Sequence, residues 1–165
     1  MLNIKLFTKA KETVLMLKHY GLKVSTAESC TGGMVATYIT SVSGVSEVFE
    51  LGITSYSNRI KNEILGVKSE TLSDFGAVSK ETALEMAINI KEKSGADFGI
   101  SVTGVAGPDG SEGHPAGYVF IGISGEHGAK TKLLNINPKS RNYVREQTVF
   151  QIFELIQNYI KEFYE

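Results

Sequence analysis

Two side chains that could act as nucleophiles, Ser29 and Cys30, are neighbours in the segment TAESCTGG at residues 26–33. Attack on an acyl carbon needs a hydroxyl or thiol and hydrogen-bond donors for the oxyanion that forms. Gly32 and Gly33 have no side chain, so a ligand can approach their backbone closely. These residue types in this order are therefore compatible with acyl-transfer chemistry.

The flanking residues place this segment where a strand ends and a helix begins. Residues 22–27 are predicted to form a strand, and apolar side chains then recur at the spacing of one helix face, at Met34, Val35, Tyr38, Ile39 and Val42. A helix N-terminus offers unpaired backbone N–H groups and the positive end of the helix dipole. The alternative is that Ser29 or Thr31 only caps the helix, as these residue types often do.

A serine nucleophile needs a base, and Lys61 is the best candidate in the chain. It lies in the first turns of a short helix predicted over residues 59–65, with Asn58 as the N-cap. A partly desolvated lysine would have a lowered pKa and could accept the serine proton, while Tyr56 could relay or orient that proton. The alternative is an ordinary solvated lysine, because buried lysines are rare.

Cys30 is the competing nucleophile, because thiolates react readily and a helix N-terminus lowers the pKa of a thiol. Adjacent helical residues point about 100° apart, so both side chains cannot face one substrate. A lone cysteine at an apolar strand–helix junction is more often a small core residue. No group of His, Cys and Asp residues has the spacing of metal ligands, so we expect no metal.

The order of predicted elements indicates an α/β fold with one domain over residues 1–165. Three strands separated by helices should be parallel, because crossovers are right-handed; they are expected at residues 22–27, 48–56 and 98–102. Two later strands, at residues 118–124 and 131–136, should form a C-terminal antiparallel hairpin. Helices are expected at residues 7–20, 33–42, 59–65, 69–74, 79–93 and 139–163. The predicted architecture is a three-layer α/β/α fold with a mixed, mostly parallel sheet of about five strands.

Parallel strands would bring polar segments together at one edge of the sheet. Ser29 follows the first strand, Tyr56 ends the second, and Thr103 and Gly104 follow the third. Open α/β sheets bind ligands beyond the carboxyl ends of their strands, where the strand order reverses. We therefore expect a ligand crevice at this edge, which favours the catalytic interpretation of Ser29 over the capping one.

Composition argues against several classes of protein. The 165 residues are 42% apolar and 21% charged, and the formal net charge of −1 gives no basic field for nucleic acid. No apolar run is long enough to cross a membrane, and the first residues lack the apolar core of a signal peptide. The single cysteine fits a reducing cytosol. We expect a cytoplasmic protein without nucleic-acid or membrane partners.

Four ordered motifs resemble the C-terminal domain family of the competence/damage-inducible protein CinA, as found in stand-alone nicotinamide-nucleotide amidases. The motifs are residues 27–33, the block from Tyr56 through Lys61 to Val67, residues 76–79 and residues 103–108. The similarity covers nearly the whole chain from about Leu15 onward. Larger family members carry an extra N-terminal domain with a separate pyrophosphatase-like role, for which we expect no room in this chain.

The resemblance implies hydrolysis of the carboxamide of nicotinamide mononucleotide, giving nicotinate mononucleotide and ammonia without a cofactor. It makes Ser29 the nucleophile and Lys61 the base, with Tyr56 nearby. Substrate contacts are expected from Cys30, Thr31, Gly32, Gly33, Thr103, Gly104, Gly107 and Arg145. Arg145 would contact the phosphate or ribose, and the amides of residues 30–33 would hold the oxyanion.

Two points stay open. Many relatives have a longer glycine-rich loop that ends in Lys-Pro-Val-Gly, whereas this loop ends in His114-Pro115-Ala116-Gly117. If that lysine contacts substrate in relatives, His114 would change the contact.

The chain could also be a non-catalytic nucleotide-binding or regulatory module of the same fold, because family names come from competence and DNA-damage phenotypes. A third possibility is an amidase of other small amides.

The predicted hairpin favours a symmetric homodimer if the first and final helices leave part of its apolar surface uncovered; the alternative is a monomer whose two outer helices cover the sheet completely. Its strands carry Tyr118, Phe120, Ile121, Ile123, Leu133, Leu134 and Ile136. Such an apolar hairpin must be covered on both faces or lie at a contact, and two-fold dimers are the commonest closed assembly. Sedimentation velocity at micromolar concentration should therefore show a dimer. A single species with the mass of one chain would contradict this prediction.

Overall fold

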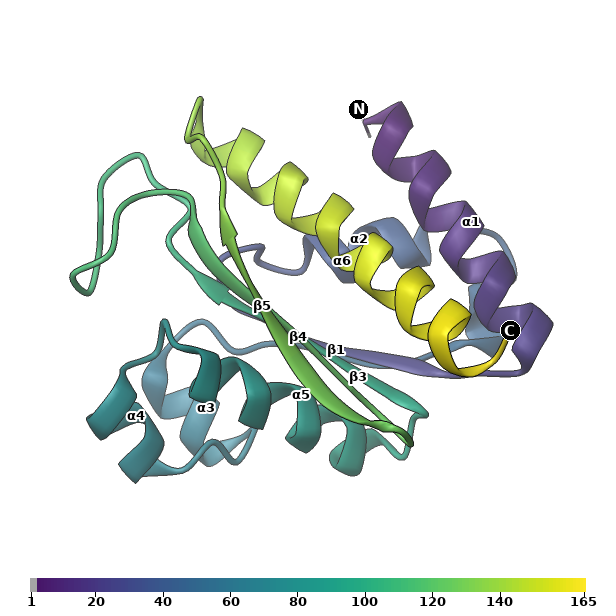
Figure 1. Ribbon diagram of the computed structural model, residues 1–165, viewed down its shortest axis with the longest axis horizontal. Helices are drawn as coiled ribbons and strands as arrows, with labels where there is room; N and C mark the ends of the chain where they lie inside the picture. Colours follow the sequence, from purple (N-terminus) through teal and green to yellow (C-terminus); the bar gives the residue numbers. More distant parts are fainter. Residues whose placement is uncertain (1–2) are drawn as a thin grey trace.

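The computed structural model describes residues 3–165 and contains a five-stranded mixed sheet between two layers of helices (Figure 1). The strands are β1 (Val24–Glu28), β2 (Phe49–Thr54), β3 (Phe98–Gly104), β4 (Tyr118–Gly125) and β5 (Gly128–Asn135). Their spatial order is β2-β1-β3-β4-β5. β1 is parallel to β2 and β3, whereas β3, β4 and β5 pair antiparallel in that order. The predicted α/β architecture with a C-terminal hairpin is confirmed.

The helices divide between the two faces of the sheet. Helices α1 (Ile4–Tyr20), α2 (Met34–Thr40) and α6 (Arg141–Phe163) cover one face (Figure 1). Helices α3 (Asn58–Glu63), α4 (Ser69–Phe75) and α5 (Lys80–Ser94) cover the other, and a 3₁₀ turn, η1, spans Val45–Glu47. Within residues 3–165, no helix has the length and apolarity needed to cross a membrane.

The central strands are buried because helices cover both of their faces. Every residue of β1 is buried, as is β3 from Phe98 to Thr103. The absence of a side chain at Gly99 lets α5 lie directly on β3, since a Cβ there would be only 2.0 Å from the Ala87 carbonyl oxygen. The strand ends that carry the polar segments therefore rest on a tightly packed support.

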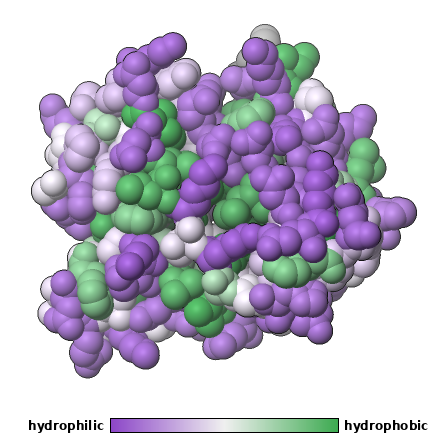
Figure 2. Space-filling model, viewed as in Figure 1, coloured by the Kyte–Doolittle hydropathy of each residue, from purple (hydrophilic) through white to green (hydrophobic). Residues whose placement is uncertain are grey.

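The hairpin is covered unequally. β4 lies between α5 and α6, whereas the edge strand β5 is mostly exposed and carries Lys130 and Lys132. Of its two leucines, Leu134 is buried and Leu133 is 37% exposed. Figure 2 shows a largely hydrophilic surface interrupted by apolar patches on the face that it presents. β4 is thus covered within one chain whereas most of β5 is exposed, and the dimer remains a prediction.

Several local expectations need correction. β2 ends at Thr54, before Tyr56, and β3 continues through Thr103 and Gly104. The side chain that caps α3 belongs to Ser57, which accepts a hydrogen bond from the Ile60 amide at 3.2 Å, so Asn58 is the first helical residue and not the cap. β1 extends to Glu28, one residue beyond its predicted end. Ser29 therefore follows the strand directly.

Candidate active site

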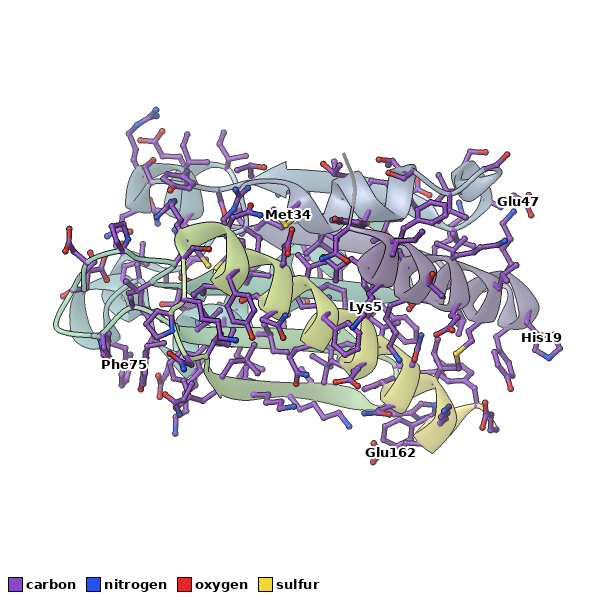
Figure 3. The ribbon with its side chains drawn as sticks, turned by 90° about the horizontal axis from the view of Figure 1, so that it is seen from above. Lys5, His19, Met34, Glu47, Phe75 and Glu162 are labelled. Carbon is purple, nitrogen blue, oxygen red and sulfur yellow. The ribbon has the colours of Figure 1, made fainter. Side chains whose placement is uncertain are left out.

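The carboxyl ends of the parallel strands open onto a cavity of about 240 Å³. β1 has β2 on one side and β3 on the other, so the strand order reverses at β1. Ser29, Tyr56, Thr103 and Gly104 all line the cavity, as the parallel arrangement predicted. In the side-chain view, the loop after β3 projects at the end of the molecule near Phe75, opposite His19 (Figure 3).

The central feature of the cavity is a serine beside a buried lysine. Ser29 Oγ lies 3.1 Å from Lys61 Nζ, and Lys61 Nζ donates a second hydrogen bond, of 2.9 Å, to the Ser55 carbonyl. The lysine is only 2% exposed, and it is the only buried residue of α3. Within residues 3–165, no carboxylate forms an ion pair with it.

Burial lowers the pKa of Lys61 below the usual value of a lysine, and the more distant charge of Glu112 opposes this shift. In the neutral amine, one N–H can remain on the Ser55 carbonyl while the nitrogen lone pair accepts the Ser29 hydroxyl proton. The structure therefore excludes a solvated Lys61 and places this side chain where a base would act.

Cys30 has the opposite environment. Its side chain is 7% exposed and packs in the main apolar core, although the residue also contributes to the cavity wall. Burial raises the pKa of the thiol to about 12, rather than lowering it as the helix N-terminus suggested. The thiol therefore stays protonated at neutral pH and is a poor nucleophile.

Neither hydroxyl of the nucleophile segment caps α2. Gly33 is the N-cap and provides no side chain, while the carboxylate of Glu28 accepts hydrogen bonds from the Val35 and Ala36 amides at 3.0 and 2.9 Å. Thr31 is buried, and its hydroxyl has no partner among the residues described. The capping alternative for Ser29 and Thr31 is therefore wrong.

The amides that could hold an oxyanion are fewer than expected. Gly32 donates its amide proton to the Ser29 carbonyl at 2.9 Å. The amides of Cys30, Thr31 and Gly33 donate no hydrogen bond to any acceptor in residues 3–165. Of these three residues only Cys30 lines the cavity, so its N–H group is the candidate donor.

Arg141 is a cavity residue that the sequence reasoning missed. As the first residue of α6, it donates to the Tyr56 hydroxyl at 2.7 Å and to the Gly107 carbonyl at 2.6 Å. Tyr56 is 59% exposed at the cavity rim and is paired with this arginine, not with Lys61. The helix cap at Ser140 is the signal that could have placed an arginine at this end of α6.

Arg145 lies one turn further along α6 and outside this cavity. Its guanidinium donates to the Thr31 carbonyl at 2.8 Å, and the residue lines a separate hollow that includes Gly32. Thr31, Gly32 and Gly33 likewise do not line the cavity that holds Ser29. The structure therefore places Arg145 where it holds the nucleophile turn.

The remaining predicted residues surround the cavity in different ways. The Thr103 hydroxyl donates to the Ala77 carbonyl at 2.6 Å, so it joins two cavity walls. Gly107 lines the cavity, as do the acidic residues Asp109 and Glu112 of the loop after β3. His114 does not line it and stacks on Tyr118, with ring centroids 4.3 Å apart.

A metal site is not formed by the described residues. Within residues 3–165, no three His, Cys, Asp or Glu side chains gather as metal ligands would. The groups able to do chemistry in the cavity are therefore the Ser29–Lys61 pair, the Arg141 guanidinium and the two loop carboxylates.

Comparison with known proteins identifies the family. The chain matches the CinA C-terminal domain over residues 7–160 and belongs to this family. A CinA-like protein of Kosmotoga olearia is 46% identical over 145 residues, covering 87% of this chain and 35% of that protein. A competence-damage inducible protein homologue of Acetivibrio thermocellus is 42% identical over 146 residues, covering 88% and 35%. The chain thus spans about a third of the length of these curated relatives.

Solved structures show the same fold over nearly their full length. The competence/damage inducible protein CihA from Agrobacterium tumefaciens has a TM-score of 0.91 and 36% identity, covering 96% of this chain and 97% of that one. A CinA superfamily protein from Klebsiella pneumoniae has a TM-score of 0.93 and 28% identity, covering 96% and 99%. The resemblance to the CinA C-terminal domain is confirmed.

The reactivity of Ser29 should follow the protonation of Lys61. Because burial lowers the lysine pKa, labelling by a fluorophosphonate should accelerate as the pH rises and level off before the usual lysine pKa. Lys61→Met, which keeps the volume and loses the amine, should react about 10²–10⁴-fold more slowly and without this rise. Intact-mass spectrometry measures both rates. Equal rates in the two proteins would rule Lys61 out as the base.

Proposed function

We propose that this protein hydrolyses the carboxamide of nicotinamide mononucleotide to nicotinate mononucleotide and ammonia. The observation that carries the proposal is the 3.1 Å contact between Ser29 Oγ and the buried Lys61 amine. Amide hydrolysis needs a nucleophile, a base for its proton and an acid for the departing amine, and this pair can supply all three. The motifs shared with nicotinamide-nucleotide amidases of the family support the choice of substrate.

The acylation step uses the neutral amine. Lys61 takes the hydroxyl proton of Ser29 while Oγ bonds to the carboxamide carbon, and the carbonyl oxygen becomes an oxyanion. The amide of Cys30, a residue that lines the cavity, is the donor proposed to stabilise this charge. The protonated Lys61 then gives its proton to the amide nitrogen, the carbon–nitrogen bond breaks, and ammonia leaves.

Deacylation repeats these roles with water. Lys61, neutral again, takes a proton from a water molecule whose oxygen attacks the ester carbon of the acyl-enzyme. Collapse of the second tetrahedral intermediate breaks the bond to Ser29 Oγ, and Lys61 returns the proton to that oxygen. The product is nicotinate mononucleotide with its carboxylic acid group, which ionises at neutral pH.

The charges of the cavity suit this substrate. Nicotinamide mononucleotide carries a cationic ring and an anionic phosphate, and the cavity has both kinds of complementary group. Arg141 can bind phosphate through its planar guanidinium, whereas Asp109 and Glu112 supply negative charge for the ring. Contacts to the phosphoribosyl part would orient the amide and so favour nicotinamide mononucleotide over free nicotinamide.

Purified protein should release ammonia from nicotinamide mononucleotide, and EDTA should not inhibit it. Ser29→Ala should abolish turnover without unfolding the chain, whereas Cys30→Ala should retain most activity because the thiol is buried and protonated. A coupled ammonia assay with circular dichroism checks these outcomes. Loss of activity only in Cys30→Ala, or loss on chelation that one divalent ion restores, would refute the mechanism. Substrate binding without ammonia release would support the nucleotide-binding module instead.

The two arginines of α6 should have separable effects. Arg141→Gln should raise the KM for nicotinamide mononucleotide about 10-fold or more, because a charge-assisted contact to the phosphate is lost. It should affect nicotinamide riboside, which lacks the phosphate, much less. Arg145→Gln should act mainly on kcat, since its guanidinium holds the Thr31 carbonyl outside the cavity. Steady-state kinetics on both substrates distinguish these cases, and an equal effect of both variants on KM would contradict this assignment.

A further inference from the structure

We propose that Glu28 is a positioning residue that determines which of the two adjacent nucleophilic side chains faces the base. Its buried carboxylate ties the end of β1 to the start of α2, and this tie turns Ser29 toward Lys61 and Cys30 into the core. The inference rests on the proposed role of Ser29 as nucleophile. It assigns a task to the one buried carboxylate beside the site that the mechanism does not use.

The contacts of the Glu28 side chain close a short loop of chain. Glu28 is 1% exposed, and its two oxygens accept hydrogen bonds from the second and third residues of α2, Val35 and Ala36. A helix cap normally comes from the residue next to the helix, whereas this one comes from the preceding strand. Residues 29–33 are thereby held between two fixed ends, and their conformation is restricted.

The backbone of Glu28 is connected to the base as well. Its carbonyl oxygen accepts a hydrogen bond of 2.8 Å from the Ser55 amide, and the Ser55 carbonyl in turn accepts one from Lys61 Nζ. On the other side, the Ser29 amide donates to the Val102 carbonyl of β3 at 3.0 Å. Glu28 therefore has a fixed position relative to Lys61 on one side and to the helix that follows Ser29 on the other.

The charge of Glu28 also separates the two candidate nucleophiles chemically. Free amides at the start of a helix stabilise a nearby thiolate. In α2, two of these amides, those of Val35 and Ala36, already donate to Glu28. Burial raises the pKa of the Cys30 thiol to about 12, and the negative charge of Glu28 acts in the same direction. Because Glu28 does not line the cavity, it cannot touch the substrate and would act only through its neighbours.

Glu28→Gln tests this role, because it keeps the shape while placing an amide N–H₂ against a backbone donor. Glu85→Gln is the matched control: Glu85 accepts hydrogen bonds from the Lys68 amide, where α4 begins, and from the Thr71 hydroxyl, away from the nucleophile turn. For each full-length variant we would measure urea unfolding, fluorophosphonate labelling of Ser29, iodoacetamide labelling of Cys30, and kcat and KM for ammonia release.

We expect Glu28→Gln to slow Ser29 labelling and lower kcat in parallel, by about 10-fold or more, with little change in KM. Cys30 labelling of the folded protein should accelerate. Glu85→Gln should lose stability without changing either labelling rate. If Glu28→Gln lowers stability but leaves both labelling rates of the folded protein unchanged, Glu28 is only a helix cap and the proposal is overturned.

Two further results keep the test decisive. If Glu28→Gln does not fold, Glu28→Asp retains the charge on a shorter side chain, and its labelling rates must shift in the same directions for the proposal to stand. Labelling does not require the nucleotide substrate. Wild-type protein that the fluorophosphonate labels at Ser29 but that releases no ammonia would therefore overturn the proposed function and leave the role of Glu28 testable. Fluorophosphonate labelling of the wild type at Cys30 instead of Ser29 would overturn both.

Discussion

The site depends on one energetic constraint, the burial of a lysine amine without a carboxylate partner. A buried ammonium ion loses its hydration, and neither the Ser29 hydroxyl nor the Ser55 carbonyl compensates for it as an ion pair would. The neutral amine is therefore favoured, and a neutral amine is the state that accepts a proton. α3 buries no residue except Lys61, so its packing adds little stability of its own. The cost of placing this group must be met by the apolar core around the central strands.

The turn that carries Ser29 is held from the sheet and from one helical layer. Glu28, at the end of β1, accepts hydrogen bonds from α2, and Arg145 of α6, in the same helical layer as α2, donates to the Thr31 carbonyl. Glu28 satisfies two backbone amides of α2, and Arg145 adds a second donor to the Thr31 carbonyl, which also accepts from the Met34 amide. A rigid turn of this kind preserves the distance between Ser29 and Lys61, and it leaves the few free amides at fixed positions.

The part of the cavity wall formed by Tyr56 and Arg141 comes from segments that are distant in the chain. Tyr56 follows β2 and Arg141 begins α6, yet the two side chains share a hydrogen bond of 2.7 Å. Arg141 also holds the Gly107 carbonyl of the acidic loop, so the cationic and anionic parts of the cavity are linked.

The sequence alone determined the α/β fold, the parallel direction of the first three strands and the convergence of Ser29, Tyr56 and Thr103 at one sheet edge. Periodicity and turn residues report which local face of an element is apolar, and topology rules then place the strand ends together. Only the tertiary structure decided that Cys30 enters the core, that Glu28 caps α2, that Arg141 rather than Arg145 lines the cavity, and that helices cover β4 but leave most of β5 exposed. Each of these depends on contacts between residues far apart in the chain or on the direction of one side chain in a glycine-containing turn. Local patterns of residues carry no record of such contacts.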